Sequence, residues 1–378
     1  MANYVYQHRL EQLNSLDFKG KVLVLYGPRR SGKTTLLKHF LAGCENYLFI
    51  SGDDKDIHDY LSSESLSKLT QFVAGYEWLV IDEAQKIKNI AANLKLLVDH
   101  FPELKIIVTG SSAFDLANQM GEPLTGRKIS WQLFPLAQLE LQAIETPQET
   151  KTNLAQRLIY GSYPEVVLQE KVSDKRTYLQ ELTRDYLYKD ILLLDGIRKT
   201  QQLEKLLQLL AFQIGKAVSL SELGTQLGMS KDTVARYINL LEKAFVLIPL
   251  AAFSRNPRKE ISKSQHYYFY DTGIRNALIN QFNELQFRQD VGELWENYLV
   301  VERLKKQSYL DLYTQNYFWR SYSQQEIDWV ENRDGKLTAY EFKWNPKAKT
   351  KAPSQWRELY PEADYQIIHP ENYLDFIC

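Results

Sequence analysis

The chain has 378 residues, of which 25% are charged and 44% hydrophobic, and its formal net charge is −1. This length is enough for two or three domains, and the composition is that of a folded soluble protein, not of a disordered or fibrous one. Because the net charge is so small, an argument for nucleic-acid binding has to come from local patches.

Two further classes of protein are disfavoured. No apolar run approaches the roughly eighteen residues of a membrane span, and the first residues, MANYVYQHRLEQL, contain no apolar signal core. We therefore expect a cytoplasmic protein with no membrane partner. Cys44 and Cys378 are the only cysteines and lack metal-ligand spacing, which argues against a disulfide framework or a zinc site.

A glycine-rich loop follows the first apolar stretch. Residues 21–27, KVLVLYG, have the length of a strand, residues 27–34 fit G-x-x-x-x-G-K-[ST], and residues 34–43 read as a helix. This is the context of a phosphate-binding loop, in which the lysine reaches the β- and γ-phosphates and the hydroxyl ligates Mg²⁺. A chance glycine loop is the alternative. The predicted ATP-binding residues are Gly27, Pro28, Arg29, Arg30, Ser31, Gly32, Lys33, Thr34 and Thr35, with Lys33 also catalytic and Thr34 also a metal ligand.

Two carboxylates follow a second buried stretch, EWLVIDEAQ. Asp82 and Glu83 stand at the carboxyl end of the predicted strand, which is the edge where parallel sheets bind ligands. We expect Asp82 to hold Mg²⁺ and Glu83 to act as the base that polarises the attacking water. An acidic pair at a solvated strand end is the plainer interpretation when the glycine loop is ignored.

Further apolar stretches at residues 46–53, 104–112 and 127–136 alternate with helical segments, which predicts a parallel sheet covered on both faces. Ser111 and Ser112 follow a strand expected between the loop strand and the acidic strand. Ser111 could orient the hydrolytic water, or these serines could cap the next helix. Arg127 precedes the last strand and could reach a neighbouring subunit's γ-phosphate, or it could be a surface arginine.

The order of GPRRSGKTT, LVIDEAQ, VTGSS, LTGR and FPL resembles a family of bacterial and archaeal AAA-type ATPases with a C-terminal domain of unknown function. The resemblance continues through GSYPEVV, DTGIRNAL, LWENYLVVERL and YEFK and covers nearly the whole chain. It implies an ATPase core, a winged helix and a restriction-endonuclease-like module, and no agreed function. It also implies that the turn containing Gly161 and Pro164 packs near the nucleotide; a helix–helix turn is the alternative.

A helix-turn-helix is predicted at residues 217–250. Ser219 and Glu222 have capping-box spacing, Gly228 ends the first helix, and Ser230 begins the second. The exposed leading edge of that second helix carries Lys231, Thr233 and Arg236 as candidate DNA contacts. A two-stranded ribbon then flanks a basic connection with candidate phosphate contacts Arg255, Arg258, Lys259 and Lys263. A solvated wing, or a lid or partner surface, remains the alternative. Asp271 is expected to cap the following helix.

The last hundred residues carry an acidic constellation. EIDWVENRDGKLTAYEFKW reads as a hairpin turning at Asp334-Gly335, with Glu341 and Lys343 on one face and Asp328 beside them. One lysine among carboxylates is the arrangement of divalent-metal nucleases; a salt-bridged solvent face is the plainer alternative. The pattern resembles the PD-(D/E)xK nucleases, with Ile327 in place of the proline.

That second resemblance supplies the remaining site residues. It implies Glu296, Asp328 and Glu341 as ligands of Mg²⁺ or Mn²⁺ and Asp328, Glu341 and Lys343 as catalytic residues. The basic stretch at residues 345–353, with Trp344 and Trp356 as aromatic neighbours, is typical of nucleic-acid binding.

The predicted fold class is α/β: an AAA-type P-loop ATPase core with a parallel sheet (residues 1–145), a helical lid (146–200), a winged helix-turn-helix (201–280) and a restriction-endonuclease-like domain (281–378). The leading hypothesis is an ATP-hydrolysing, DNA-processing oligomer, such as a hexameric ring, that cuts branched or foreign DNA. The alternative is a nucleotide-dependent switch whose nuclease-like domain is inactive and binds DNA or protein.

Overall fold

The computed structural model describes residues 8–111, 124–184, 200–254, 265–348 and 350–378. The chain forms two compact units, each treated by itself below. The N-terminal unit comprises residues 6–135 with 243–245, and the C-terminal unit comprises residues 136–242 and 246–378 with residues 1–5. Among the described residues, no helix has the length and apolarity needed to cross a membrane.

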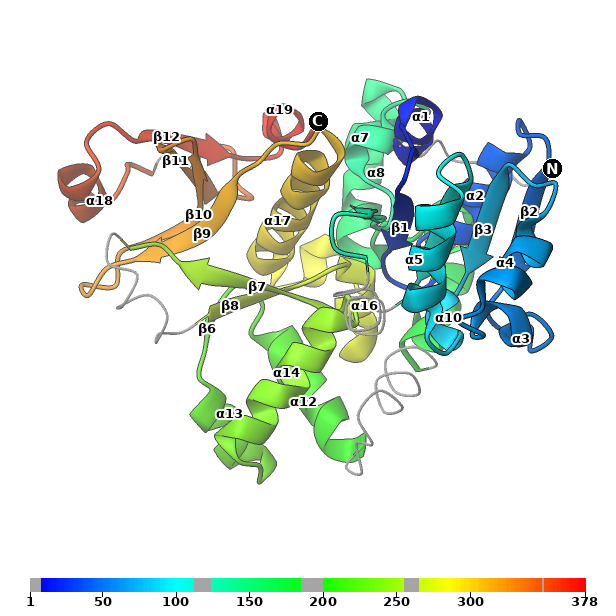
Figure 1. Ribbon diagram of the computed structural model, residues 1–378. Coiled ribbons are helices and arrows are strands. Elements are labelled where there is room, and N and C mark those ends of the chain that lie inside the picture. Colours follow the sequence, from blue (N-terminus) through cyan, green and yellow to red (C-terminus); the bar gives the residue numbers. More distant parts are fainter. Residues whose placement is uncertain (1–7, 112–123, 185–199, 255–264, 349) are drawn as a thin grey trace. The chain divides into compact units, whose positions relative to one another are not determined.

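A five-stranded parallel sheet forms the centre of the N-terminal unit (Figure 1). Its strands are β1 (Val22–Tyr26), β2 (Tyr47–Ser51), β3 (Trp78–Asp82), β4 (Lys105–Gly110) and β5 (Lys128–Gln132), in the order β2-β3-β4-β1-β5. All five stretches predicted as strands are therefore strands, and β4 lies between the loop strand β1 and the acidic strand β3, as expected. The carboxyl ends of these strands meet at one edge, which brings the glycine loop and Asp82 together.

Helices cover both faces of this sheet. They are α1 (Arg9–Ser15), α2 (Lys33–Leu41), α3 (His58–Leu61), α4 (Leu66–Val73) and α5 (Ile90–His100), with the 3-10 turn η1 (Ala84–Lys86). Along β1, Val22 and Val24 pack into one buried cluster with α4 and α5, whereas Leu23 and Leu25 pack into another with α1 and α2. Burial on both faces explains why the central strands β1, β3 and β4 read as apolar runs without alternation.

The C-terminal unit begins with helices. These are α7 (Gln138–Leu141), α8 (Pro147–Tyr160), α9 (Pro164–Leu168), α10 (Val172–Leu182), α12 (Thr200–Phe212), α13 (Leu220–Leu227), α14 (Lys231–Lys243) and α16 (Thr272–Leu278). Later come η3 (Leu285–Phe287), α17 (Val291–Tyr309), α18 (Ser354–Leu359) and α19 (Tyr373–Ile377). The predicted helix, turn and helix are present as α13 and α14. The Ser219 hydroxyl accepts from the Glu222 N–H, and Gly228 ends α13 in the left-handed conformation.

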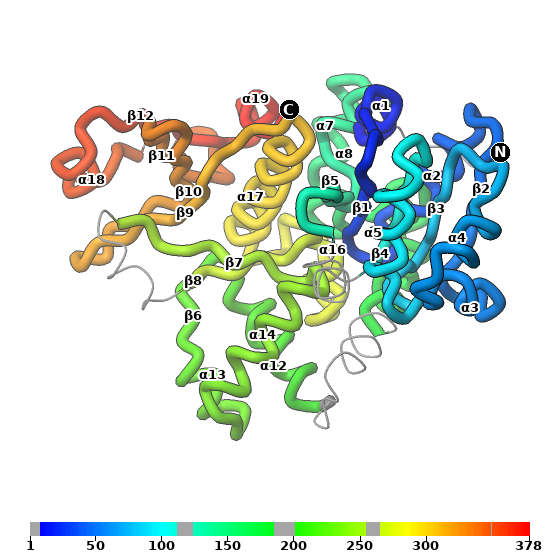
Figure 2. Tube along the Cα trace, viewed as in Figure 1, coloured from blue at the N-terminus to red at the C-terminus, as the bar shows by residue number. Residues whose placement is uncertain are grey.

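One seven-stranded sheet runs through this unit in the order β12-β11-β10-β9-β7-β8-β6. Its strands are β6 (Ala217–Val218), β7 (Leu247–Ala252), β8 (Gln265–Phe269), β9 (Gln315–Arg320), β10 (Glu326–Arg333), β11 (Lys336–Phe342) and β12 (Asp364–Ile368). The predicted hairpin is β10 and β11, with Arg333 opposite Lys336. The ribbon strand β7 pairs in parallel with β9, and Figure 2 traces the two side by side. The sheet is thus continuous from the ribbon after α14 to the acidic hairpin.

The cap residue Asp271 contacts the turn at Gly161 in the buried part of this unit. The Asp271 carboxylate caps α16 by accepting from the N–H groups of Gly273 and Ile274, as predicted, and it also accepts from the Ser162 N–H at 2.7 Å. Gly161 has φ 74°, and a Cβ there would lie 1.9 Å from the Asp271 carboxylate. Burial raises the pKa of Asp271 to about 6. The GSYPE turn is therefore fixed by Asp271 within its own unit.

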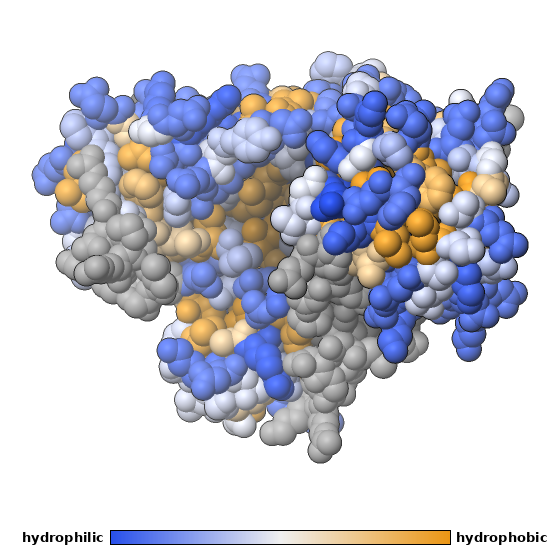
Figure 3. Space-filling view, viewed as in Figure 1, coloured by the Kyte–Doolittle hydropathy of each residue, from blue (hydrophilic) through white to orange (hydrophobic). Residues whose placement is uncertain are grey.

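The visible surface is mainly hydrophilic (Figure 3), as expected for a chain in which 25% of the residues are charged. Figure 3 shows hydrophilic residues over most of the visible surface, interrupted by smaller apolar areas. The core of the C-terminal unit is aromatic and includes Trp295, Trp329 and Phe318, each at most 1% exposed.

Candidate functional site

The glycine loop follows β1 and opens α2. Gly32 adopts φ 100°, and a Cβ on Gly27 would lie 2.0 Å from the Leu133 carbonyl oxygen, so no larger residue fits at position 27. The Lys33 ammonium donates to the carbonyl oxygens of Gly27 and Pro28, both at 2.9 Å. Burial lowers the Lys33 pKa to about 8, against the opposing charges of Glu83 and Asp82. The lysine thus lies against the loop, and its ammonium donates to carbonyl oxygens where phosphate oxygens could accept instead.

The predicted magnesium ligands meet directly. The Thr34 hydroxyl donates to Asp82 Oδ2 at 2.7 Å, and Asp82 Oδ1 accepts from the Thr109 hydroxyl. Thr109 is completely buried at the end of β4 and also accepts from the Glu83 N–H at 3.0 Å. A threonine hydroxyl and an aspartate carboxylate are oxygen ligands of the kind Mg²⁺ prefers. These residues fit a magnesium ion bound with nucleotide phosphates.

The carboxylate of Glu83 is held by two side chains. Glu83 Oε2 accepts from the Gln85 amide at 2.5 Å and from the Ser111 hydroxyl at 3.1 Å. Ser111 is only 6% exposed. Its hydroxyl contacts the carboxylate of Glu83, which is a different contact from the helix cap considered above. Ser112 lies outside the described residues. Because the two donors fix one oxygen of Glu83, its other oxygen is available to accept a proton from water.

The backbone at Glu83 is strained. Glu83 has φ 52°, in the left-handed region that costs a non-glycine residue about 1 kcal/mol or more. Gly52, at the end of β2, donates its N–H to the Asp82 carbonyl at 2.7 Å, and a Cβ there would lie 2.3 Å from the Glu83 carbonyl oxygen. Gly52 is thus required for the neighbouring strand to support this conformation.

The other predicted residues of this unit differ in their surroundings. Thr35 is exposed and Ser31 is buried. Arg30 adopts φ 62° at the crest of the loop. Arg127 lies at the amino end of β5 and donates to Asp99 Oδ1 at 2.6 Å. Its role toward a neighbouring subunit stays a prediction, since it requires a second copy of the chain. Pro164 begins α9 in the other unit, and its contact with nucleotide likewise stays a prediction.

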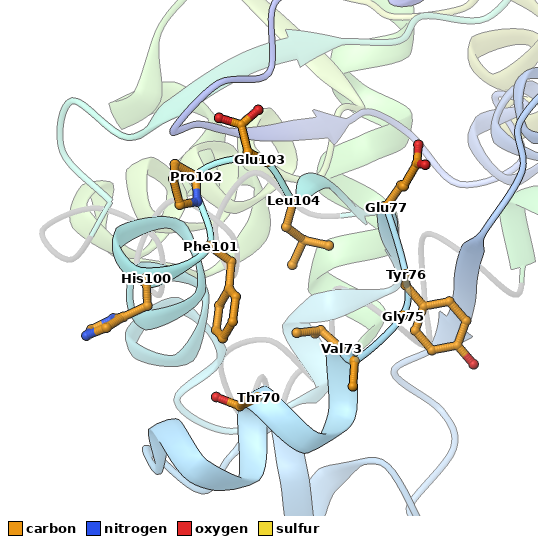
Figure 4. Close-up of a pocket in the computed structure, with 11 residues that line it drawn as sticks. Thr70, Val73, Gly75, Tyr76, Glu77, His100, Phe101, Pro102, Glu103 and Leu104 are labelled. Atoms are coloured by element: carbon orange, nitrogen blue, oxygen red, sulfur yellow. The ribbon is translucent and has the colours of Figure 1, made fainter.

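A larger cavity of the N-terminal unit is not the nucleotide site. It has a volume of about 500 Å³ and is lined by residues preceding β3 and β4, including Val73, Tyr76 and Phe101 (Figure 4). These residues lie at the amino ends of the strands, whereas the glycine loop and Asp82 lie at the carboxyl ends. The cavity is therefore at the opposite end of the sheet from the phosphate loop.

The acidic constellation of the C-terminal unit is brought together as predicted. Lys343 donates to Glu341 Oε1 at 2.6 Å, and Asp328 Oδ2 accepts from the Phe342 N–H at 2.7 Å. Glu296, on α17, accepts from the Tyr268 hydroxyl at 2.7 Å. Tyr268 belongs to β8, so the ribbon that follows α14 supplies one side of this cluster.

Burial dominates the electrostatics of the cluster. It raises the pKa of Asp328 to about 7, with help from the charge of Glu341, and it raises the pKa of Glu296 well above its ordinary value, with help from Asp328. Burial lowers the pKa of Lys343, but the hydrogen bond to Glu341 and the negative charges of Glu341, Asp328 and Glu296 together outweigh it and raise that pKa. Close to neutral pH, protons therefore compete with any cation for these carboxylates.

No metal cage is formed in advance. Within the described ranges, no three or more His, Cys, Asp or Glu side chains converge as a metal site. The three carboxylates of this cluster interact electrostatically, but each already accepts a hydrogen bond. Glu296 accepts from Tyr268, Asp328 from the Phe342 N–H and Glu341 from Lys343. Their role as ligands of Mg²⁺ or Mn²⁺ stays a prediction that requires these partners to be released.

The candidate DNA contacts are only partly described. Lys231 and Arg236 are exposed on α14, and Thr233 is half-buried with its N–H donating to the Ser230 hydroxyl. Arg255, Arg258, Lys259 and Lys263 lie outside the described residues. The expectation for Trp356 was wrong: it is 1% exposed and packs on Trp319 and Tyr360 in the core, so it is unavailable to stack on a base.

Comparison with known families bears on the first of these sites. Residues 19–142 match the family model described as an AAA domain. These residues are similar to a P-loop ATPase domain of the AAA type and are called the AAA domain below. Residues 151–285 and 291–374 match two further models, described as domains of unknown function DUF8612 and DUF4143. The AAA domain thus contains the whole glycine loop, Asp82, Glu83, Thr109 and Ser111.

Related proteins occur in bacteria and archaea. An uncharacterized protein of Mycobacterium tuberculosis is 26% identical over 349 residues, covering 90% of this chain and 73% of its own. An uncharacterized protein of Methanocaldococcus jannaschii is 24% identical over 348 residues, covering 85% and 75%. Among solved structures, a Walker-type ATPase of Pyrococcus abyssi is similar with a TM-score of 0.48 and 16% identity, over 72% of this chain and 94% of that one.

Sequence reasoning missed three residues of these sites: Thr109, Gln85 and Tyr268. Thr109 could have been found, because it is the last polar residue before Gly110 at a strand end. The side chain of Gln85 reaches back to Glu83 only through the turn at η1, and Tyr268 reaches Glu296 only across the sheet. Neither contact has a sequence spacing that would reveal it.

Proposed function

We propose that the chain is an ATPase that binds DNA and couples nucleotide turnover to it. The observation that carries the first half is the Thr34–Asp82–Thr109 arrangement, with Glu83 beside it and held by Gln85 and Ser111. It joins two oxygen ligands for a magnesium ion and an oriented carboxylate at the edge of the AAA domain where the glycine loop lies.

In this proposal the residues of the site divide the work. Mg²⁺, bound through Thr34 and Asp82, would neutralise charge on the β- and γ-phosphates. Lys33 would leave the Gly27 and Pro28 carbonyl oxygens for the phosphates, and the loop N–H groups would complete the cradle. Glu83 would take the proton of the attacking water. In a ring-shaped oligomer, Arg127 of an adjacent copy would complete the site. It would release its ion pair with Asp99 and contact the γ-phosphate.

For DNA, we propose that α13, α14 and the ribbon β7–β8 act as a winged helix. Lys231, Thr233 and Arg236 would meet the groove and backbone, and the basic connection containing Arg255, Arg258, Lys259 and Lys263 would add phosphate contacts. The support is that α14 buries its apolar face through Val234, Tyr237, Ile238 and Leu241 and leaves Lys231 and Arg236 exposed.

For the acidic cluster, we propose that Asp328, Glu341 and Glu296 take up Mg²⁺ or Mn²⁺ when DNA arrives, and that Lys343 then orients water at the scissile phosphate. A second candidate competes here: a nucleotide-dependent switch whose nuclease-like domain only binds DNA or protein. The proton-holding carboxylates and the existing Lys343–Glu341 pair favour this second candidate.

One experiment separates these functions. The full chain is incubated with linear, single-stranded and junction DNA, with and without ATP and with Mg²⁺ or Mn²⁺, while phosphate release and nicking are followed. DNA-stimulated phosphate release that Glu83→Gln abolishes supports the proposal. The matched control is Glu103→Gln, which changes an exposed carboxylate of the same domain.

Two outcomes decide against parts of the proposal. Phosphate release that does not respond to any DNA supports the switch. Nicking that survives Lys343→Ala as well as it survives the control Lys336→Ala, an exposed lysine of the same hairpin, contradicts the assignment of the acidic cluster as a nuclease.

A further inference from the structure

A small cavity in the helical part of the C-terminal unit carries an inference that is independent of the proposed function. The cavity has a volume of about 70 Å³ and lies beside α8, the turn at Gly161, α9 and α10. Its polar lining residues are Glu145, Asn153, Gln156, Arg157, Tyr160 and Lys175, and its apolar ones include Val166 and Val167. A water molecule needs about 30 Å³, so the volume suits two waters or one small tetrahedral ion.

Arg157 brings a buried positive charge to this cavity. The residue is 4% exposed, and its Nε–H has no hydrogen-bond partner among the described residues. Both terminal nitrogens of the guanidinium are engaged: Nη2 pairs with the Glu145 carboxylate and Nη1 donates to the Thr150 carbonyl oxygen at 3.5 Å. The Glu145 carboxylate also accepts from Thr150 and Asn153. A buried N–H left without an acceptor is destabilising, so a ligand oxygen that accepts from it would be stabilised.

Lys175 adds a second cation. Its ammonium lies 5.9 Å from the centre of the Tyr160 ring, and it makes no ion pair within the described part of the chain. Burial and the nearby charge of Arg157 lower the pKa of Lys175. The side chains that line the cavity thus include two cations and one carboxylate, a net charge of +1 that an anion would neutralise.

The third polar group is an acceptor. Gln156 lines the cavity, and its buried Oε1 has no donor among the described residues. A ligand that satisfies all three groups needs oxygens that accept from Arg157 and Lys175 and a hydroxyl that donates to Gln156. Hydrogen phosphate and singly protonated phosphomonoesters have both, whereas sulfate has no hydroxyl at neutral pH.

We propose that this cavity binds a phosphate group, seated between Arg157 and Lys175 with its hydroxyl on Gln156. Glu145 sets the charge and orientation of Arg157 and so acts as a positioning residue. The site is separate from the glycine loop, because every residue that lines it belongs to the C-terminal unit.

The test is equilibrium dialysis of the full chain against radiolabelled inorganic phosphate. Because the glycine loop can also bind phosphate, the measurement is made in Lys33→Ala, which removes that contribution. We expect about one phosphate per chain to remain bound. Adding Lys175→Gln should weaken binding roughly tenfold, the effect of losing one charge-assisted hydrogen bond. Lys171→Gln, an exposed lysine outside the cavity, should change nothing.

Two competitors identify the source and the selectivity. Glycerol phosphate that displaces phosphate indicates a terminal phosphate group as the natural ligand, and failure to displace it indicates the free ion. Sulfate should compete at least several-fold less well than phosphate, and Gln156→Leu should remove that preference. The proposal is overturned if Lys33→Ala binds no phosphate at millimolar concentration, or if Lys175→Gln and Lys171→Gln bind it equally.

Discussion

The edge of the AAA domain and the acidic cluster of the C-terminal unit both gather carboxylates, but in different surroundings. Asp82 and Glu83 accept hydrogen bonds from the side chains of Thr34, Thr109, Gln85 and Ser111, which fix their orientation. Asp328 and Glu296 are instead partly buried beside other carboxylates, and burial together with those charges raises their pKa values. The first arrangement is ready for a magnesium ion, whereas the second must first lose protons.

This difference predicts that the two regions respond differently to substitution. Changes at the AAA edge should reduce turnover and leave stability almost unchanged, because they remove a chemical group and keep the fold. Removing a carboxylate from the acidic cluster should raise stability, because the fold then no longer has to bury a charge.

The largest effect is expected from Glu83→Gln. The amide keeps the size of the side chain but cannot take a proton, so kcat for ATP hydrolysis should fall by about 10²- to 10⁴-fold. Nucleotide binding, measured by equilibrium titration with ATP and Mg²⁺, should remain. Glu103→Gln serves as the control. A loss of less than threefold would remove Glu83 from the role of base.

Next in size is a pH effect in the acidic cluster. The pKa of Asp328 is raised to about 7 from its model-peptide value near 3.8, so the stability that this group contributes is fully present below about pH 4 and is lost as the pH rises to about 7. Asp328→Asn has no proton to lose. Its free energy of unfolding should decline less over this range and should exceed the wild-type value at pH 8 by about 2 kcal/mol. This difference is smaller than the full pKa shift would give, because solvent reaches the side chain.

Chemical denaturation at several pH values measures this difference. Asp334→Asn, in the turn of the same hairpin, is the matched control, since asparagine tolerates the left-handed backbone found there. If Asp328→Asn is less stable than the wild type at pH 8, the carboxylate is stabilising as an anion and the contrast between the two regions disappears.

A smaller effect is expected from Gln85→Ala. Without its amide, one donor to Glu83 is lost and the carboxylate is less well oriented, so kcat should fall roughly tenfold, the value of one hydrogen bond to a charged group. The KM for ATP should stay unchanged, because Gln85 touches the base and not the phosphate loop. A change in KM alone, with kcat preserved, would assign Gln85 a structural role in binding.

The smallest effect concerns DNA. Arg236→Ala on α14 should weaken binding to duplex DNA a few-fold and reduce the slope of log affinity against log salt by about one. Fluorescence anisotropy at several salt concentrations measures both quantities. Lys68→Ala, an exposed lysine of α4 in the AAA domain, should change neither. Equal slopes for all three proteins would exclude α14 from the DNA interface.

The sequence was sufficient for the parallel sheet because its central strands β1, β3 and β4 are buried on both faces and therefore read as apolar runs. The same reasoning located Asp82, Glu83 and Ser111 at one edge, since parallel strands end together. The hairpin of Asp328 and Glu341 was predictable from its Asp334-Gly335 turn, and the cap of Asp271 from its position before a helix.

The features that could not be predicted from the sequence depend on contacts between distant segments. The continuous sheet from the ribbon to the hairpin rests on the parallel pairing of β7 with β9, which the order of elements along the chain does not reveal. Tyr268 reaches Glu296 through that same sheet. Trp356 was misjudged because a basic neighbourhood in sequence says nothing about burial, and its ring packs inward against Trp319 and Tyr360.

The central claim is that the AAA domain binds and hydrolyses a magnesium-bound nucleoside triphosphate. The most direct measurement is the release of radiolabelled phosphate from ATP by the purified full chain, beside Lys33→Ala under the same conditions. The account predicts multiple turnovers that require Mg²⁺ and are lost in Lys33→Ala. Retained nucleotide without phosphate release, or equal release by both proteins, would contradict it.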